Sequence, residues 1–104
     1  MKRGQVWWAH LLGPAGRRPV LILSRDAMLP GHGEVTVAYL TSTIRHRPVE
    51  VFLTRADGVH KTCVVNLDAI NTIPKSCLKY LICTLSPAKM DEVKQAILEA
   101  LDMK

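Results

Sequence analysis

The stretch EVTVAYLTSTIRHRPVEV, residues 34–51, decides the fold of this chain. Residues 35–40 are β-branched, aromatic or apolar on both alternating faces, which is typical of a central strand covered on both sides. Hydroxyls, two arginines and a histidine follow at 41–47, and a proline then ends the run before a second strand at 49–53. We therefore expect a rigid strand that delivers these polar side chains to one edge of the fold, where loops commonly carry function.

The chain before this stretch predicts two further strands. The first covers residues 6–11, VWWAHL, in which Trp7 and Trp8 point to opposite faces because side chains alternate along a strand. We expect one tryptophan in the core and the other as a hydrophobic lid over the end of the barrel. A glycine- and proline-containing turn follows at 12–17, and the apolar run PVLILS at 19–24 predicts a buried strand.

The chain after this stretch predicts a hairpin and three more strands. An Asp-Gly pair at 57–58 is a hairpin signal. Short strands are predicted at 61–65 and 69–73, separated by a turn at 66–68, and a final strand is predicted at 78–85.

A helix is predicted at the C-terminal end of the sequence. Ser86 and Pro87 supply an N-cap hydroxyl and a proline at the first helical position. Apolar residues then recur at helical spacing and form a face that packs onto the barrel or onto a second copy, namely Met90, Val93, Ala96, Ile97, Ala100 and Leu101.

The order of these elements indicates the fold class. Short strands spaced by turn signals and followed by one helix predict a mostly β fold with a C-terminal α-helix, as a small, strongly bent sheet or barrel. A doubly wound α/β fold is disfavoured because no helical pattern separates the strands.

Length, composition and charge narrow the range of functions. With 104 residues, 48% of them apolar and 22% charged, the chain is expected to fold as one domain, residues 1–104. The formal net charge of +5 favours a polyanionic partner without choosing among nucleic acid, an acidic protein and a membrane surface. Three cysteines without a C-x-x-C motif, and no signal-peptide or membrane-span pattern, predict reduced thiols in a cytoplasmic protein without a membrane partner.

The sequence lacks the motifs of metal-dependent, nucleotide-binding and lipase-type enzymes. The four histidines are dispersed and none has metal-ligand spacing with a cysteine or carboxylate, so we expect no metal and no cofactor. G-x-x-x-x-G-K, G-x-G-x-x-G and G-x-S-x-G are absent, although spacing alone leaves a Ser-His-Asp triad open. A basic, hydroxyl-rich edge remains. Metal-free RNA cleavage needs little more, because the ribose 2′-OH is the nucleophile while arginine and a hydroxyl hold the phosphate.

The sequence resembles the MazF/PemK-type toxins of bacterial type II toxin–antitoxin systems. The resemblance extends over nearly the whole chain, and its segments run in the family's order. These segments are RGQVWWA at 3–9, RRPVLILSRD at 17–26, LTSTIR at 40–45, PVEV at 48–51, CVVNLDAI at 63–70, TIPK at 72–75 and the helix that contains Met90, Val93 and Ile97.

The resemblance implies an SH3-like β-barrel, a homodimer and a metal-independent, sequence-specific endoribonuclease that cuts single-stranded RNA by 2′-OH attack. It also implies a cognate antitoxin whose acidic, extended tail covers the RNA site, which the positive charge of this chain would suit.

The resemblance also places the family's two key residues. Arg18 matches the arginine of the R-P-V-L pattern, and is assigned to phosphate stabilisation and to protonation of the leaving 5′-oxygen. Thr41 matches the threonine at the end of the central strand, and is assigned to holding the phosphate or the 2′-OH. Weaker candidates for RNA binding are Arg17, Ser42, Thr43, Arg45 and His46.

One departure from the family concerns the loop at 11–17. This loop is short and lacks the longer acidic or glycine-rich insert of many members, so it offers no carboxylate as a general base. Two alternatives stay open on the same fold: a non-enzymatic gyrase-binding toxin, and an SH3-like binding module without toxicity. Retention of both Arg18 and Thr41 favours the nuclease.

Overall fold

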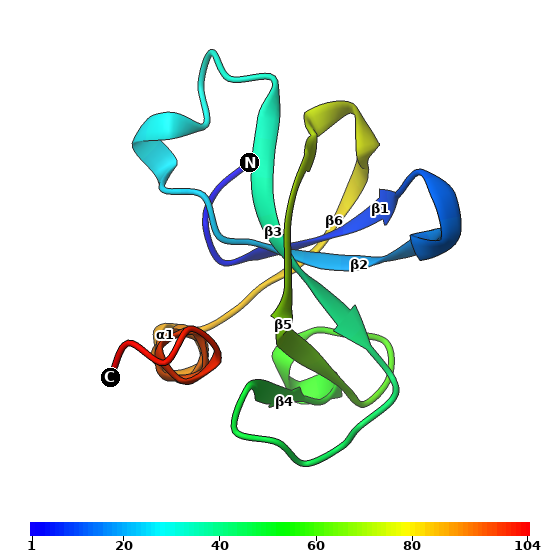
Figure 1. Cartoon of the computed structure of the whole chain (residues 1–104). Helices are drawn as coiled ribbons and strands as arrows, with labels where there is room; N and C mark the ends of the chain where they lie inside the picture. The colour runs from blue at the N-terminus through cyan, green and yellow to red at the C-terminus, as the bar shows by residue number, and fades with distance from the viewer.

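Six strands and one α-helix make up the chain in a computed structural model that describes residues 1–104 (Figure 1). The strands and the helix are β1 (Gln5–His10), β2 (Arg17–Ile22), β3 (Glu34–Thr41), β4 (Glu50–Leu53), β5 (Cys63–Pro74), β6 (Leu78–Thr84) and α1 (Pro87–Ala100). Short 3-10 turns lie between strands at Gly13–Ala15, Asp26–Met28, Arg55–Asp57 and Lys75–Cys77.

All six strands form one antiparallel sheet in the order β4-β5-β3-β2-β1-β6. β3 pairs with β2 on one side and β5 on the other, which confirms the central strand predicted at 35–40. The sheet is strongly curled (Figure 1). Its outer strands β4 and β6 do not pair with each other, so the barrel stays open and the fold is a half-barrel. The predicted mostly β fold with a C-terminal helix is confirmed, in the form of a strongly bent sheet.

β3 is covered on both faces because its side chains alternate between two cores. Val35 and Val37 pack into the smaller hydrophobic cluster. Ala38 and Leu40 point to the opposite face and belong to the larger cluster, which α1 covers. The alternation along one strand therefore fixes both halves of the hydrophobic core.

Helix α1 begins and packs as its sequence predicts. The Ser86 hydroxyl accepts a hydrogen bond from a first-turn backbone N–H at 3.2 Å, and Pro87 occupies the first helical position. Val93 and Ala96 are buried in the larger core, so the apolar face of the helix packs on its own sheet. Leu101, at the end of that face, stays 57% exposed.

A lysine joins α1 to the edge of the sheet. Lys89 donates from Nζ to the backbone carbonyl of Phe52 on β4, at 2.8 Å, and also pairs with Glu92 at 3.3 Å.

α1 has neither the length nor the apolarity to cross a lipid bilayer.

The turn predicted at 66–68 is wrong. β5 is one continuous strand of 12 residues, so the two short strands expected here are a single element. Its pairing with β3 slips beside Tyr39, and residues 67–69 bulge out of the ladder. The polar residues in this segment therefore mark a bulge, which bends the strand without ending it.

The hairpin predicted from the Asp-Gly pair at 57–58 is confirmed, because β4 and β5 are consecutive strands that pair antiparallel. Residues 54–62 connect β4 to β5 and contain a 3-10 turn. Thr54 and Asp57 stabilise this turn as a capping pair. The Thr54 hydroxyl accepts a backbone N–H within the turn at 3.2 Å, and the Asp57 carboxylate accepts the Thr54 N–H at 2.9 Å.

Gly58, which ends this turn, is the glycine with the least room for a side chain. Its φ is 105°, and a Cβ at this position would lie 2.5 Å from the Cβ of Cys83. We expect Gly58→Ala to lower the free energy of unfolding by about 1–3 kcal/mol through backbone strain, with a further loss from the clash. Urea unfolding followed by circular dichroism measures this change.

Gly31→Ala is the matched control for this prediction. Gly31 also has a positive φ, 81°, but no atom lies within 4 Å of the position that a Cβ would occupy there, so its substitution reports the strain alone. Equal losses of stability in the two variants would contradict a steric role for the contact with Cys83.

Candidate functional site

A cleft of about 460 Å³ is lined by residues from the turn end of β1 and β2, the end of β3, the start of β5 and β6. Its 13 lining residues include three basic side chains, one histidine and three hydroxyls, but no carboxylate. Such a lining favours a negatively charged ligand.

The two residues assigned to catalysis from the sequence line this cleft together. Arg18 comes from β2 and Thr41 is the last residue of β3, and these strands are neighbours in the sheet. Arg17 and Ser42, which are the adjacent residues in the sequence, line the cleft as well. The fold therefore brings together side chains from two segments that lie far apart in the chain.

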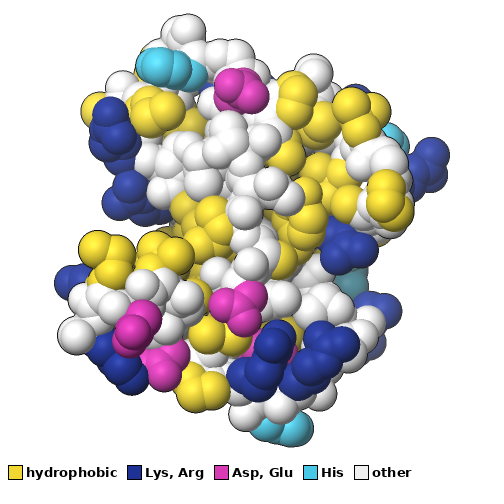
Figure 2. All heavy atoms as spheres, in the orientation of Figure 1, with side chains coloured by type: hydrophobic (Ala, Val, Ile, Leu, Met, Phe, Trp, Pro, Cys, Tyr) yellow, Lys and Arg dark blue, Asp and Glu magenta, His cyan; other side chains and the backbone are white.

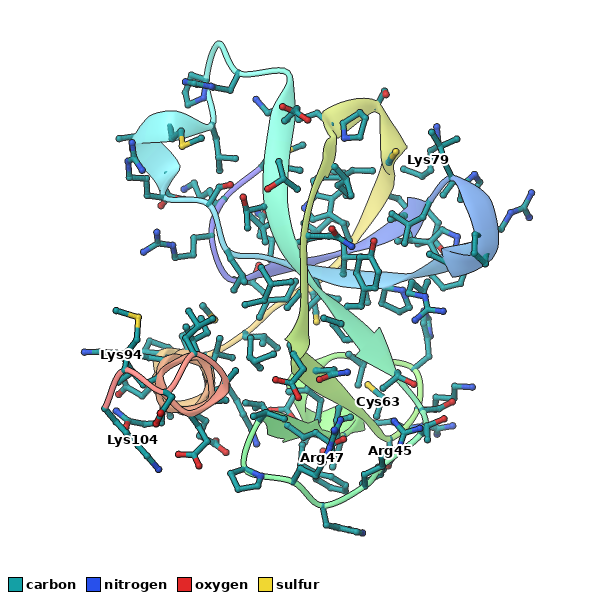
Figure 3. All side chains as sticks on the ribbon, in the orientation of Figure 1. Arg45, Arg47, Cys63, Lys79, Lys94 and Lys104 are labelled. Carbon is teal, nitrogen blue, oxygen red and sulfur yellow. The ribbon has the colours of Figure 1, made fainter.

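The other three candidates, Thr43, Arg45 and His46, do not line the cleft. They lie in the loop between β3 and β4, and Figure 3 labels Arg45 and Arg47 of this loop in the lower part of the molecule. Glu50, whose side chain is 3% exposed, organises this loop. Its carboxylate accepts the N–H groups of Arg45 at 3.0 Å and Arg47 at 3.4 Å.

The Glu50 carboxylate is stabilised in its charged form. Burial by itself would raise the pKa of Glu50, but the two N–H groups and the Arg47 guanidinium outweigh it and leave this pKa below its ordinary value. A carboxylate with a lowered folded pKa stabilises the fold above its unfolded pKa, and this contribution is lost as the pH falls through the folded pKa. At neutral pH the loop therefore keeps its arrangement of basic side chains.

Arg18 is held from two directions within the fold. Its Nε donates to the carbonyl of Ala15, in the turn between β1 and β2, at 3.0 Å. Its guanidinium carbon lies 5.5 Å from the centre of the Tyr39 ring. The two terminal nitrogens of the guanidinium make no hydrogen bond within the protein, so this two-pronged donor is free to bind an anion.

The cleft also contains residues that sequence reasoning missed. His60 and Lys61 enter it from the connection before β5, where the Arg55 guanidinium fixes the His60 carbonyl through a 3.0 Å hydrogen bond. The sequence signal that could have identified them is the position of two basic residues between Gly58 and the next strand. Trp8 lines the cleft and stacks on Tyr80 of β6, with ring centres 6.3 Å apart and planes at 18°.

Two ionisable groups in and beside the cleft have shifted pKa values. Burial, then the charges of Arg17 and Lys79, lower the pKa of His10, which pairs with Arg17 across the β1–β2 ladder. Burial, then the neighbouring Cys83 thiol, raise the pKa of Cys63, so this cleft residue is a thiol and not a thiolate nucleophile. No group of His, Cys, Asp or Glu side chains is arranged to hold a metal ion.

Acidic side chains gather on a different part of the surface. Figure 2 shows Asp and Glu side chains in the lower left, over α1, and Lys and Arg side chains on both sides of this face. Asp91, Glu92 and Glu99 of α1 line a shallow groove beside β4, which is separate from the cleft. Carboxylates are thus absent from the cleft but line the groove beside α1.

Comparison with known proteins connects this geometry to a family. Residues 2–101 match the model for the "PemK-like, MazF-like toxin of type II toxin-antitoxin system". A Mycobacterium tuberculosis protein named "Probable endoribonuclease MazF2" is 41% identical over 98 residues, which cover 93% of this chain and 94% of that protein.

Solved structures of similar proteins share the fold. Mycobacterium tuberculosis toxin MazF-mt6 has a TM-score of 0.88 at 33% identity, over 96% of this chain and 98% of that one. A mycobacterial endoribonuclease in complex with its cognate antitoxin has a TM-score of 0.89 at 33% identity, over 100% and 97% of the two chains. Because both the family match and the 41% identical relative span nearly the whole sequence, this chain belongs to the PemK-like, MazF-like toxins of type II toxin–antitoxin systems.

Proposed function

We propose that the chain is an endoribonuclease toxin whose cleft cuts single-stranded RNA, including mRNA, at a specific sequence and without a metal ion. The observation that carries this proposal is the convergence of Arg18 and Thr41 on one cleft that contains no carboxylate. The name of the 41% identical relative, a probable endoribonuclease, supports it. In this proposal residues 1–104 act as one toxin domain in the cytoplasm, where mRNA is found.

The proposed reaction is an attack within the RNA backbone. The ribose 2′-OH loses its proton, its oxygen bonds to the adjacent phosphorus, and the bond from phosphorus to the 5′-oxygen breaks. The products are a 2′,3′-cyclic phosphate and a 5′-OH, once the leaving oxygen has gained a proton. DNA lacks the 2′-OH, so the same site leaves DNA intact.

Arg18 would stabilise the charge that develops on the phosphorane. Its Nε and one face of the guanidinium are already occupied by Ala15 and Tyr39, which leaves the two terminal nitrogens to contact the non-bridging oxygens. A guanidinium that is fixed before the substrate binds needs little rearrangement during the reaction.

Thr41 would hold the phosphate or the 2′-OH. Its hydroxyl oxygen accepts the N–H of Thr43 at 3.1 Å, so its position is fixed while its own proton stays available for donation. Ser42 supplies a second hydroxyl to the same cleft.

We assign removal of the 2′-OH proton to His60. It is the one histidine that lines the cleft, and no carboxylate lines it. Imidazole is the side chain that most often transfers protons near neutral pH. The hydrogen bond from Arg55 to the His60 carbonyl holds the backbone of this residue in place.

We also propose two protein partners. A cognate acidic antitoxin would cover the cleft, because an acidic peptide complements its basic lining and the mycobacterial relative was solved in complex with its cognate antitoxin. A second copy of the chain would cover exposed apolar side chains on the outer strands, where Phe52, Tyr80 and Leu81 are each about half exposed.

The first test is cleavage of a long, end-mapped RNA in EDTA by purified protein free of antitoxin. We expect cuts at one short motif with 2′,3′-cyclic phosphate ends. Arg18→Ala is expected to lower the rate by about 10²–10³-fold, because it removes the main donor to the developing negative charge. Thr41→Val is also expected to lower the cleavage rate.

Arg25→Ala is the matched control, since it removes an exposed arginine outside the cleft and is expected to leave the rate unchanged. Equal losses in Arg18→Ala and Arg25→Ala would contradict the assignment of Arg18. Folded wild-type protein that cuts none of a range of RNAs would instead favour a gyrase-binding toxin or an inactive binding module.

The second test concerns the proton acceptor and uses the pH dependence of single-turnover cleavage. We expect His60→Gln to lower the rate by about 10²–10⁴-fold at neutral pH and to remove the fall in rate toward acid pH. Arginine, lysine, tyrosine and cysteine are the other ionisable residue types in the cleft, and none ordinarily titrates between about pH 5 and 7.

His32→Gln is the control for this test, because His32 is exposed in the loop that precedes β3, at the opposite end of that strand from Thr41. An unchanged acid limb in His60→Gln would exclude His60 as the base while leaving the nuclease assignment in place.

A further inference from the structure

We propose that Tyr39, held in place by Asn71, is a positioning residue for Arg18; this inference rests on the proposed nuclease function. The three residues lie on three adjacent strands, Arg18 on β2, Tyr39 on β3 and Asn71 on β5. Asn71 donates from its side-chain amide to the Tyr39 hydroxyl at 3.1 Å. The Tyr39 ring in turn lies 5.5 Å from the guanidinium carbon of Arg18.

Strand pairing places these side chains on one face of the sheet. Tyr39 pairs with Val20, so it lies diagonally across from Arg18, two residues earlier on β2. Asn71 pairs with Val37, and it therefore lies diagonally across from Tyr39 on the other side of β3. Diagonal neighbours on one face are within reach of long side chains, and aromatic rings make such contacts in sheets.

The Tyr39 ring can act as a fixed platform because it is itself supported. Tyr39 is partly buried and packs against the smaller core cluster that contains Val35 and Val37. The hydrogen bond from Asn71 restrains the other end of the ring. A cation over the face of an aromatic ring is attracted by the negative potential of that face, so the ring favours one orientation of the guanidinium.

Tyr39 and Asn71 are not among the residues that line the cleft, so their effect would reach the substrate through Arg18. Ala15 fixes Nε and Tyr39 covers one face of the guanidinium, and together they select a rotamer with both terminal nitrogens free. Without the ring, Arg18 would sample more conformations and would be correctly placed in a smaller fraction of encounters.

The test measures steady-state kcat and KM for RNA cleavage by Tyr39→Leu, Tyr39→Phe and Asn71→Ala. We expect Tyr39→Leu to lower kcat about tenfold, the size that one cation–π contact allows, with a smaller change in KM. Tyr39→Phe keeps the ring and is expected to stay within about threefold of wild type, as is Asn71→Ala, because each loses only the restraint of the hydroxyl.

A double-mutant cycle with Arg18→Lys connects Tyr39 to Arg18. Lysine cannot keep the planar stacking or the Nε contact, so Tyr39→Leu is expected to have little further effect on kcat in that background. Additive losses in the cycle would overturn the inference, because they would show that Tyr39 acts independently of Arg18.

Thr72→Val is the matched control for Asn71→Ala. Thr72 is the next residue on β5, and its hydroxyl bonds that of Thr36 on β3 at 2.9 Å, away from Tyr39. We expect this variant to match wild type in kcat. Thermal unfolding of every variant separates a loss of fold from a loss of activity, and Tyr39→Met replaces Tyr39→Leu if the leucine variant does not fold.

The outcomes distinguish this inference from the function on which it rests. If Arg18→Ala abolishes cleavage while folded Tyr39→Leu has wild-type kcat, the nuclease assignment stands and the positioning role is wrong. If Tyr39→Phe loses as much as Tyr39→Leu, the ring is not the operative group and the inference is also wrong. A wild-type chain that cuts no RNA overturns the proposed function, and this inference with it.

Discussion

The burial of β3 on both faces is the constraint on which the rest of the structure depends. Its side chains alternate between two hydrophobic cores while both of its edges pair with neighbouring strands. A strand fixed in this way cannot slip by one residue, because every buried side chain would then change faces. The position of Thr41 at its end, and of the Tyr39 ring two residues before, is therefore set by the core itself.

The distribution of charge follows from folding and not from composition alone. Basic and acidic residues are mixed along the sequence, yet the cleft contains no carboxylate and the acidic side chains of α1 face a different groove. Glu50 differs from the acidic residues of α1 because its side chain is almost fully buried. It is buried beneath the β3–β4 loop, where it holds the backbone that presents Arg45 and Arg47.

The sequence predicts the elements whose signals are local, and it misses those that depend on pairing. The double-sided pattern of β3 and the cap at Ser86 need only neighbouring residues, and both predictions are confirmed. The bulge in β5 depends on the pairing register with β3, so the polar residues at 66–68 predict a turn that the structure does not contain. Arg18 and Thr41 were placed by family resemblance, whereas placing His60 in the cleft and Tyr39 against Arg18 required the three-dimensional structure.

The half-barrel has two unequal edges, and the bond from Lys89 to the Phe52 carbonyl shows why. At β4, a strand of four residues, an outward-facing acceptor is already occupied by an ammonium group from α1. At β6, a strand of seven residues, the turn that ends at Gly58 lies against Cys83, whereas Tyr80 and Leu81 are about half exposed. A segment from another chain would therefore meet a lysine at one border of the sheet and exposed apolar side chains at the other, so the two borders are not equivalent as docking edges.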